Sequence, residues 1–71
     1  MNIENFVPIA AYQQSRENVF PTLPSLRWFM RSRIDDLVTK GVMIRVANRK
    51  MLNIEAMDEY VLRVGQEEAR A

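Results

Sequence analysis

Apolar residues recur at helical spacing in the middle of the chain. Between residues 25 and 40 they fall three or four positions apart, which predicts one amphipathic helix that ends at Gly41. Arg33 falls inside the apolar sector, and we expect its guanidinium to reach solvent along its aliphatic stem. The apolar face is expected to contain Leu26, Phe29, Met30, Ile34, Leu37 and Val38.

Prolines divide the chain before this helix. The run Phe6-Val7-Pro8-Ile9 predicts a short strand, which Pro8 confines to a sheet edge because proline has no backbone donor. A short helix is expected at 10–18. Proline restricts the residue before it, so the two prolines within 20–24 predict a turn between helices.

The second half of the chain predicts a hairpin and a third helix. The β-prone runs 43–46 and 50–52 flank a turn at 47–49, where Asn48 tolerates a left-handed conformation. Asn53 is a good N-cap, and apolar spacing from Ile54 through Tyr60 and Val61 predicts a helix that Gly65 ends. We therefore expect residues 1–71 to form a single, mainly α domain that contains a small β-hairpin. Its ordered core is expected at about 6–64, followed by a frayed tail at 66–71.

Composition argues against catalysis. The chain has neither cysteine nor histidine, which removes thiol nucleophiles, zinc fingers and imidazole general bases. Asp35 and Asp36 are adjacent on a helix and point about 100° apart. The two glycines, Gly41 and Gly65, cannot form a phosphate-binding loop. We expect no enzymatic activity, no metal and no cofactor.

The apolar runs are also too short for a membrane span of roughly 20 residues. The first residues lack a basic region followed by an apolar stretch, so no secretory signal is expected. We expect a cytoplasmic, nucleoid-associated protein.

Charge is unevenly distributed along the chain. Residues 25–50 carry seven basic and two acidic side chains, a net charge of +5, whereas 1–24 carry −1 and 51–71 carry −3. A basic centre between acidic flanks is typical of a surface that meets a polyanion. A solvated charged surface is the alternative.

The order of helix, proline turn, basic helix, basic hairpin and capping helix resembles a winged helix-turn-helix. The residues that carry the resemblance are Leu26-Arg27-Trp28, Gly41, Arg45 and Arg49. Over about 6–64 the chain resembles the excisionases, or recombination directionality factors, of phages and mobile elements, whose fold is related to that of MerR-type regulators. Such proteins commonly carry glycine and a basic residue at the hairpin tip, where this chain has Ala47 and Asn48, and its proline turn is longer.

The expected DNA contacts lie on the central helix and on the hairpin, or wing. Arg27 and Arg31 share an exposed face, suited to a guanine edge or a phosphate, with a solvated face as the alternative. Ser25 is suited either to a phosphate contact or to an N-cap. The expected contacts on the helix are Ser25, Arg27, Trp28, Arg31, Ser32 and Arg33, and those on the wing are Arg45, Asn48, Arg49 and Lys50.

Trp28 lies on the polar side of the helix. We expect its indole to pack against the N-terminal segment or the third helix, with contact to a sugar or a thymine methyl as the alternative.

The resemblance implies an accessory factor that binds and bends double-stranded DNA near an attachment site and directs a tyrosine-type integrase toward excision. Self-association on tandem DNA sites is expected. The alternatives are a small transcriptional regulator that uses the same surface, and a protein-interaction or inhibitor module that binds through Trp28.

Overall fold

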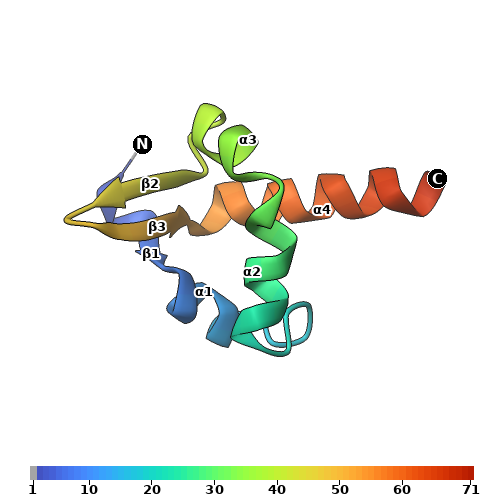
Figure 1. Ribbon diagram of the computed structural model, residues 1–71, viewed down its shortest axis with the longest axis horizontal. Helices are drawn as coiled ribbons and strands as arrows, with labels where there is room; N and C mark the ends of the chain where they lie inside the picture. The colour runs from blue at the N-terminus through green and yellow to red at the C-terminus, as the bar shows by residue number, and fades with distance from the viewer. Residues whose placement is uncertain (1) are drawn as a thin grey trace.

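Four α-helices and a small three-stranded sheet make up residues 2–71, the part of the chain that the computed structural model describes (Figure 1). The sheet lies at one end, and α4 runs from the sheet past the other helices to the opposite end. The mainly α class with a small hairpin is confirmed. None of the described helices has the length and apolar character needed to cross a membrane. In chain order the elements are η1 (Ile3–Asn5), β1 (Phe6–Pro8), α1 (Ile9–Ser15), α2 (Leu23–Arg31), α3 (Ile34–Thr39), β2 (Met43–Val46), β3 (Arg49–Asn53) and α4 (Ile54–Arg70).

The sheet is antiparallel, with strand order β1-β3-β2. β1 pairs with β3 through partners such as Val7 and Leu52, and Pro8 lies on this edge strand. The edge strand expected at the N-terminus is therefore confirmed.

The β2–β3 hairpin closes through a two-residue turn. Ala47 and Asn48 both have positive φ, 50° and 64°, between the paired residues Val46 and Arg49. Two consecutive left-handed residues form a type I′ turn, whose twist matches that of the strands. The turn is one residue shorter than the expected 47–49, because Arg49 already pairs in β3.

Helix α2 begins two residues earlier than expected. Thr22 is its N-cap and forms a capping box with Ser25: the Ser25 N–H donates to Thr22 Oγ1, and the Thr22 N–H donates to Ser25 Oγ, both at 3.2 Å. Pro24 lies in the first turn, where a missing backbone donor costs nothing.

The single helix expected between 25 and 40 is wrong. The chain leaves helical geometry at Ser32 and Arg33, and α3 begins at Ile34. The Arg33 guanidinium donates to the Phe29 carbonyl oxygen at 2.8 Å, which satisfies a backbone group at the break. After the change of direction Leu37 is completely buried but Val38 is 54% exposed, so the expected place of Val38 on the buried apolar face is wrong.

Gly41 ends α3 as predicted. Its φ is 74°, its N–H donates to the Val38 carbonyl, and the Val42 N–H donates to the Leu37 carbonyl. This is a Schellman motif, and Val42 and Leu37 supply the apolar contact that accompanies it.

The core lies between the helices and one face of the sheet. Phe29 stacks edge-to-face on Phe20 and Tyr60, with ring centroids 5.3 and 6.3 Å away. The buried residues of this cluster are Tyr12, Phe20, Leu26, Met30, Leu37, Val42, Met43, Leu52, Met57 and Tyr60.

Helix α4 continues through Gly65 to Arg70, so both the expected end at Gly65 and the frayed tail are wrong. Asn53 caps it as predicted by accepting from the Ala56 N–H at 2.9 Å. An interior glycine costs about 1 kcal/mol relative to alanine, which weakens a helix without ending it. Arg33 Nη2 and Glu68 Oε1 form an ion pair 3.6 Å apart. This pair links the C-terminal half of α4, which projects beyond the other helices, to the α2–α3 turn.

Two hydrogen-bonded carboxylates fasten α4 to the other helices. Asp58 accepts from the Tyr12 hydroxyl at 2.6 Å and from two nitrogens of Arg16 at 2.8 and 2.6 Å. The Arg16 guanidinium holds the pKa of Asp58 below its ordinary value. The Tyr60 hydroxyl donates to Asp36 at 2.8 Å and lowers the pKa of that carboxyl. These bonds fix α1 and α3, and with them the position of α2.

Candidate nucleic-acid interface

The exposed face of α2, which we call the crest, is basic and aromatic. Arg27, Trp28 and Arg31 are exposed, whereas Leu26 and Met30 on the opposite side are 0% and 3% exposed. The helical period separates these two faces within nine residues. As predicted, Arg27 and Arg31 therefore share one exposed face.

Trp28 is 70% exposed, so the expectation that its indole packs against a neighbouring element is wrong. Its neighbour Phe29 occupies the aromatic position in the core, between Phe20 and Tyr60. The Arg31 guanidinium carbon lies 5.4 Å from the centre of the indole ring, within range of a cation–π interaction.

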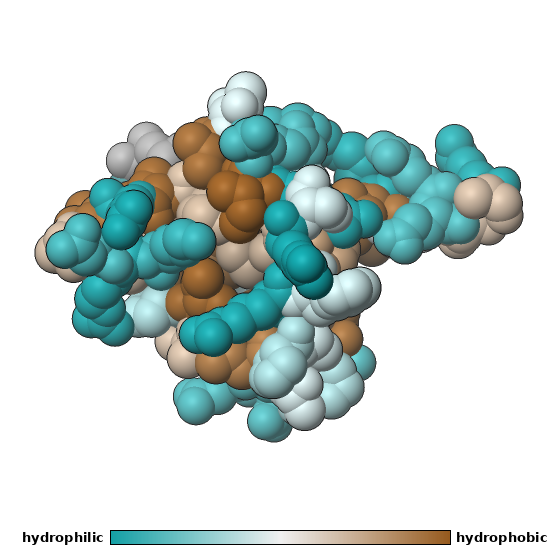
Figure 2. All heavy atoms as spheres, in the orientation of Figure 1, coloured by the Kyte–Doolittle hydropathy of each residue, from teal (hydrophilic) through white to brown (hydrophobic). Residues whose placement is uncertain are grey.

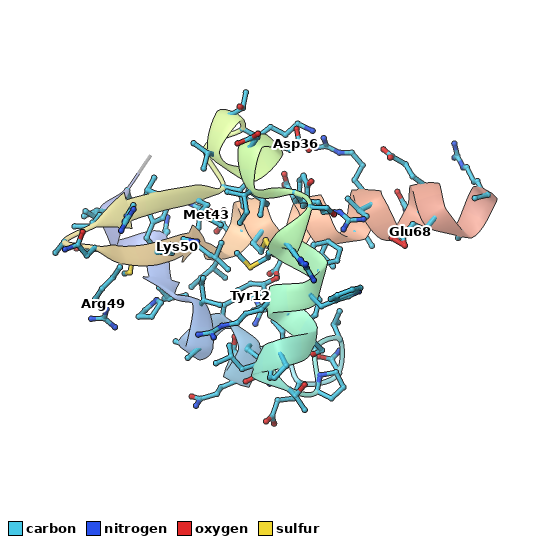
Figure 3. All side chains as sticks on the ribbon, in the orientation of Figure 1. Tyr12, Asp36, Met43, Arg49, Lys50 and Glu68 are labelled. Carbon is cyan, nitrogen blue, oxygen red and sulfur yellow. The ribbon has the colours of Figure 1, made fainter. Side chains whose placement is uncertain are left out.

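The β2–β3 hairpin changes from apolar to basic along one face. The cross-strand pair Met43–Leu52 is buried in the core, and the next pair on this face is Arg45–Lys50, which is exposed. Figure 3 shows Lys50 between the hairpin and α2. Arg49 belongs to the other face because side chains alternate along a strand.

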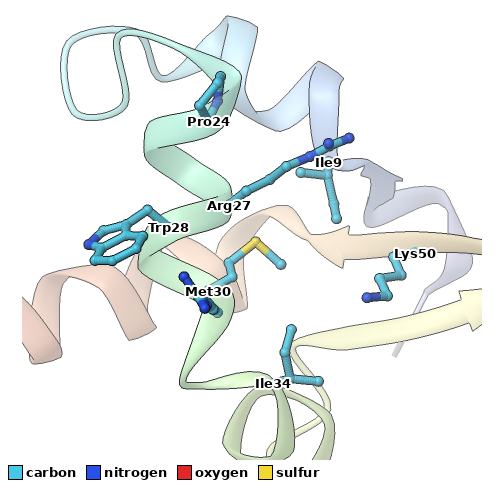
Figure 4. A pocket seen from close by; sticks show the side chains of 8 residues that line it. Ile9, Pro24, Arg27, Trp28, Met30, Ile34 and Lys50 are labelled. Atoms are coloured by element: carbon cyan, nitrogen blue, oxygen red, sulfur yellow. The ribbon is translucent and has the colours of Figure 1, made fainter.

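An open groove of about 710 Å³ lies between α2 and the hairpin (Figure 4). Arg27, Trp28 and Arg31 line it from α2, and Lys50 lines it from β3. Its remaining lining residues are Ile9, Pro24, Met30 and Ile34. Sequence reasoning did not assign these four to a site: Met30 and Ile34 were expected on the apolar face, and Pro24 in a turn, while Ile9 comes from a separate helix, α1.

A second open groove, of about 880 Å³, lies on the other side of the crest, and Trp28 and Arg31 line both grooves. Helix α2 is therefore a ridge between two hollows. The second groove is also lined by Val19, Phe20, Ser25, Phe29, Ser32, Arg33 and Glu68.

Two of the expected contact residues, Ser25 and Arg33, have structural bonds. Ser25 Oγ donates to the Thr22 carbonyl at 2.6 Å besides accepting within the capping box, so its hydroxyl proton is used. Arg33 packs its guanidinium carbon 4.5 Å from the centre of the Phe29 ring and pairs with Glu68. Asn48 is exposed at the hairpin turn, where its left-handed backbone shapes the tip. Ser32 is exposed at the C-cap of α2.

The cations of the crest and the hairpin differ from Arg16, Arg33 and Lys40 in their pairing. Arg16, Arg33 and Lys40 each pair with a carboxylate. Within residues 2–71, no ion pair is found for the five cations that we call the interface cations: Arg27, Arg31, Arg45, Arg49 and Lys50. Figure 2 shows hydrophilic side chains over the hairpin and along α4, with apolar atoms exposed between them.

The acidic side chains lie mainly elsewhere. Residues 51–71 carry five acidic and two basic side chains, and most of this segment is the projecting helix α4. Carboxylates thus concentrate away from the hairpin tip, and the excess of basic side chains lies within residues 25–50.

In comparisons with known proteins, no family model, no curated protein and no solved structure matches this chain.

Proposed function

We propose that this chain is a winged helix-turn-helix protein that binds double-stranded DNA sequence-specifically and has no catalytic activity. In this proposal α1 and α2 form the helix-turn-helix, α2 is the recognition helix, and the β2–β3 hairpin is the wing. The observation that carries it is the set of five interface cations on two neighbouring elements, none of them in an ion pair within residues 2–71. Such cations are suited to releasing counterions from a phosphate backbone.

The shape of α2 supports a duplex as the ligand. A helix about 10–12 Å across fits the major groove, which is about 12 Å wide. Because hollows flank α2 on both sides, a ridge of this form can enter the major groove of the DNA while the two phosphate backbones pass beside it. Lys50 and Arg45 then meet phosphates beside the helix, and Arg49 at the wing lies near the adjacent minor groove.

We further propose an excisionase-type role, supported by the sequence resemblance. The protein would bend DNA near an attachment site in the cytoplasm and direct a tyrosine-type integrase toward excision. A single module of this kind buries roughly 600–1,000 Å² against DNA, which is small for tight specific binding. Self-association on tandem sites would supply the missing specificity. A transcriptional regulator using the same surface is the alternative within DNA binding.

A protein-interaction module is the candidate from another class, and the exposure of Trp28 favours it. Exposed tryptophan beside arginine is common at the energetic centre of protein interfaces. The dependence of binding on salt separates the two classes, because neutralising phosphates releases counterions.

The test is a titration of a labelled duplex of unrelated sequence at several salt concentrations, followed by fluorescence anisotropy. Arg27→Ala, Arg31→Ala and Lys50→Ala should each lower the slope of log affinity against log salt by about one unit if the cation holds a phosphate. Arg63→Ala is the matched control, because Arg63 is exposed on α4 and also makes no ion pair within residues 2–71. Salt-independent binding, or a slope that only Arg63→Ala changes, would contradict the proposal.

A further inference from the structure

A single large apolar side chain stands among the cations on the crest of α2. Trp28 lies next to Arg27 in sequence, and the Arg31 guanidinium carbon is 5.4 Å from its ring centre. It lines both grooves and is 70% exposed, so it stands at the top of the ridge. An indole in this position contributes little to the core but would meet whatever α2 enters.

The chemistry of the major groove offers one apolar partner to such a side chain. Base edges there present hydrogen-bond donors and acceptors, and the only apolar group is the C5-methyl of thymine. Guanidinium groups bind guanine edges or phosphates, whereas an indole face gains most by removing a methyl from water.

We propose that Trp28 is a specificity-determining residue that reads a thymine methyl, so that the preferred DNA site contains a thymine at the position facing the middle of α2. The inference rests on the proposed function, because it requires α2 to enter the major groove. The cation–π contact holds the Arg31 guanidinium beside the indole, so the two side chains contact neighbouring positions of the site.

The test removes one methyl at a time from the DNA. Preferred duplexes are first selected from a randomised library with the wild-type protein, and each thymine of the best duplex is then replaced by deoxyuridine. Burying one methyl corresponds to about a fourfold change in affinity, so one replacement should weaken wild-type binding by about that factor. Trp28→Ala should bind the thymine and uracil duplexes equally, and Trp28→Phe should keep part of the preference. Leu62→Ala, which shortens another exposed apolar side chain, should keep all of it.

Several results would overturn the inference. It fails if the wild type is indifferent to every thymine methyl, if Trp28→Ala keeps the discrimination, or if selection yields no thymine facing α2. In each of these cases salt-dependent binding to duplex still supports the proposed function. If salt-dependent binding is itself absent, both proposals fail.

Discussion

Replacing Asp58 by asparagine tests the contact that holds α1 against α4. The Asp58 carboxylate accepts three hydrogen bonds, one from the Tyr12 hydroxyl and two from Arg16. These bonds join Asp58 to side chains that lie 46 and 42 positions earlier in the chain. Asp58→Asn keeps the size of the side chain but removes its charge and one acceptor. We expect the variant to fold and to be less stable.

The magnitude follows from the number and exposure of these bonds. A hydrogen bond to a charged group contributes about 1.5–3 kcal/mol when desolvated. The side chains of Arg16 and Asp58 are 29% and 41% exposed, so solvent screening reduces the value of their pair. The Tyr12 hydroxyl keeps an amide oxygen as acceptor. We therefore expect a loss of about 1–2 kcal/mol, or roughly 5–15 °C in Tm for a domain of this size.

Thermal unfolding by circular dichroism as a function of pH is the assay. The pKa of Asp58 is lowered in the folded state, so its charge stabilises the fold above the unfolded pKa of about 3.9 and loses this effect as pH falls through the folded value. The difference in Tm between the wild type and Asp58→Asn should therefore be constant near neutral pH and shrink below about pH 4. Glu59→Gln, at the exposed neighbouring position, is the control. Equal Tm values at neutral pH, or a difference that does not depend on pH, would refute the reasoning.

Four further predictions concern single positions. Gly41→Ala should cost about 1–2 kcal/mol in urea unfolding, because φ is 74° there; an unchanged midpoint would argue against the Schellman motif. Gly65→Ala should stabilise by about 0.5–1 kcal/mol, since its Cβ would meet nothing within 4 Å; no gain would indicate that the end of α4 is not helical. Trp28→Ala should change stability by less than about 0.5 kcal/mol, as for an exposed site, and a loss of several kcal/mol would mean that the indole is packed. Arg49→Glu should weaken single-site binding and also reduce cooperativity on a multi-site fragment, if the wing of one copy lies near the acidic α4 of the next; strictly independent filling of adjacent sites by the wild type would contradict this.

Features set by a few neighbouring residues could be predicted from the sequence. Pro8 limits a strand to an edge, Gly41 ends a helix, and Asn53 caps one, because each acts through its own backbone or the next few residues. The hairpin could also be predicted from local sequence, because two β-prone runs flank a turn that contains Asn48.

Features set by tertiary contacts could not be predicted from the sequence. Apolar spacing continues from Met30 to Ile34 across the break after α2, so periodicity alone predicts one helix. At the break Arg33 bonds to the Phe29 carbonyl and also pairs with Glu68, which is 35 positions away and is invisible to local periodicity. Trp28 was expected to pack because large aromatic residues usually do, but Phe29 fills that position in the core. The groove residues of the candidate site meet only in the folded chain.

Backbone amide shifts during titration with a short duplex at low salt test the central claim most directly. With ¹⁵N-labelled protein, we predict that the largest changes fall on 23–31 in α2 and on 43–53 in the hairpin, while 62–71 in the projecting half of α4 change little. Changes that concentrate on α4 and leave α2 and the hairpin unmoved would contradict binding of DNA by the recognition helix and wing.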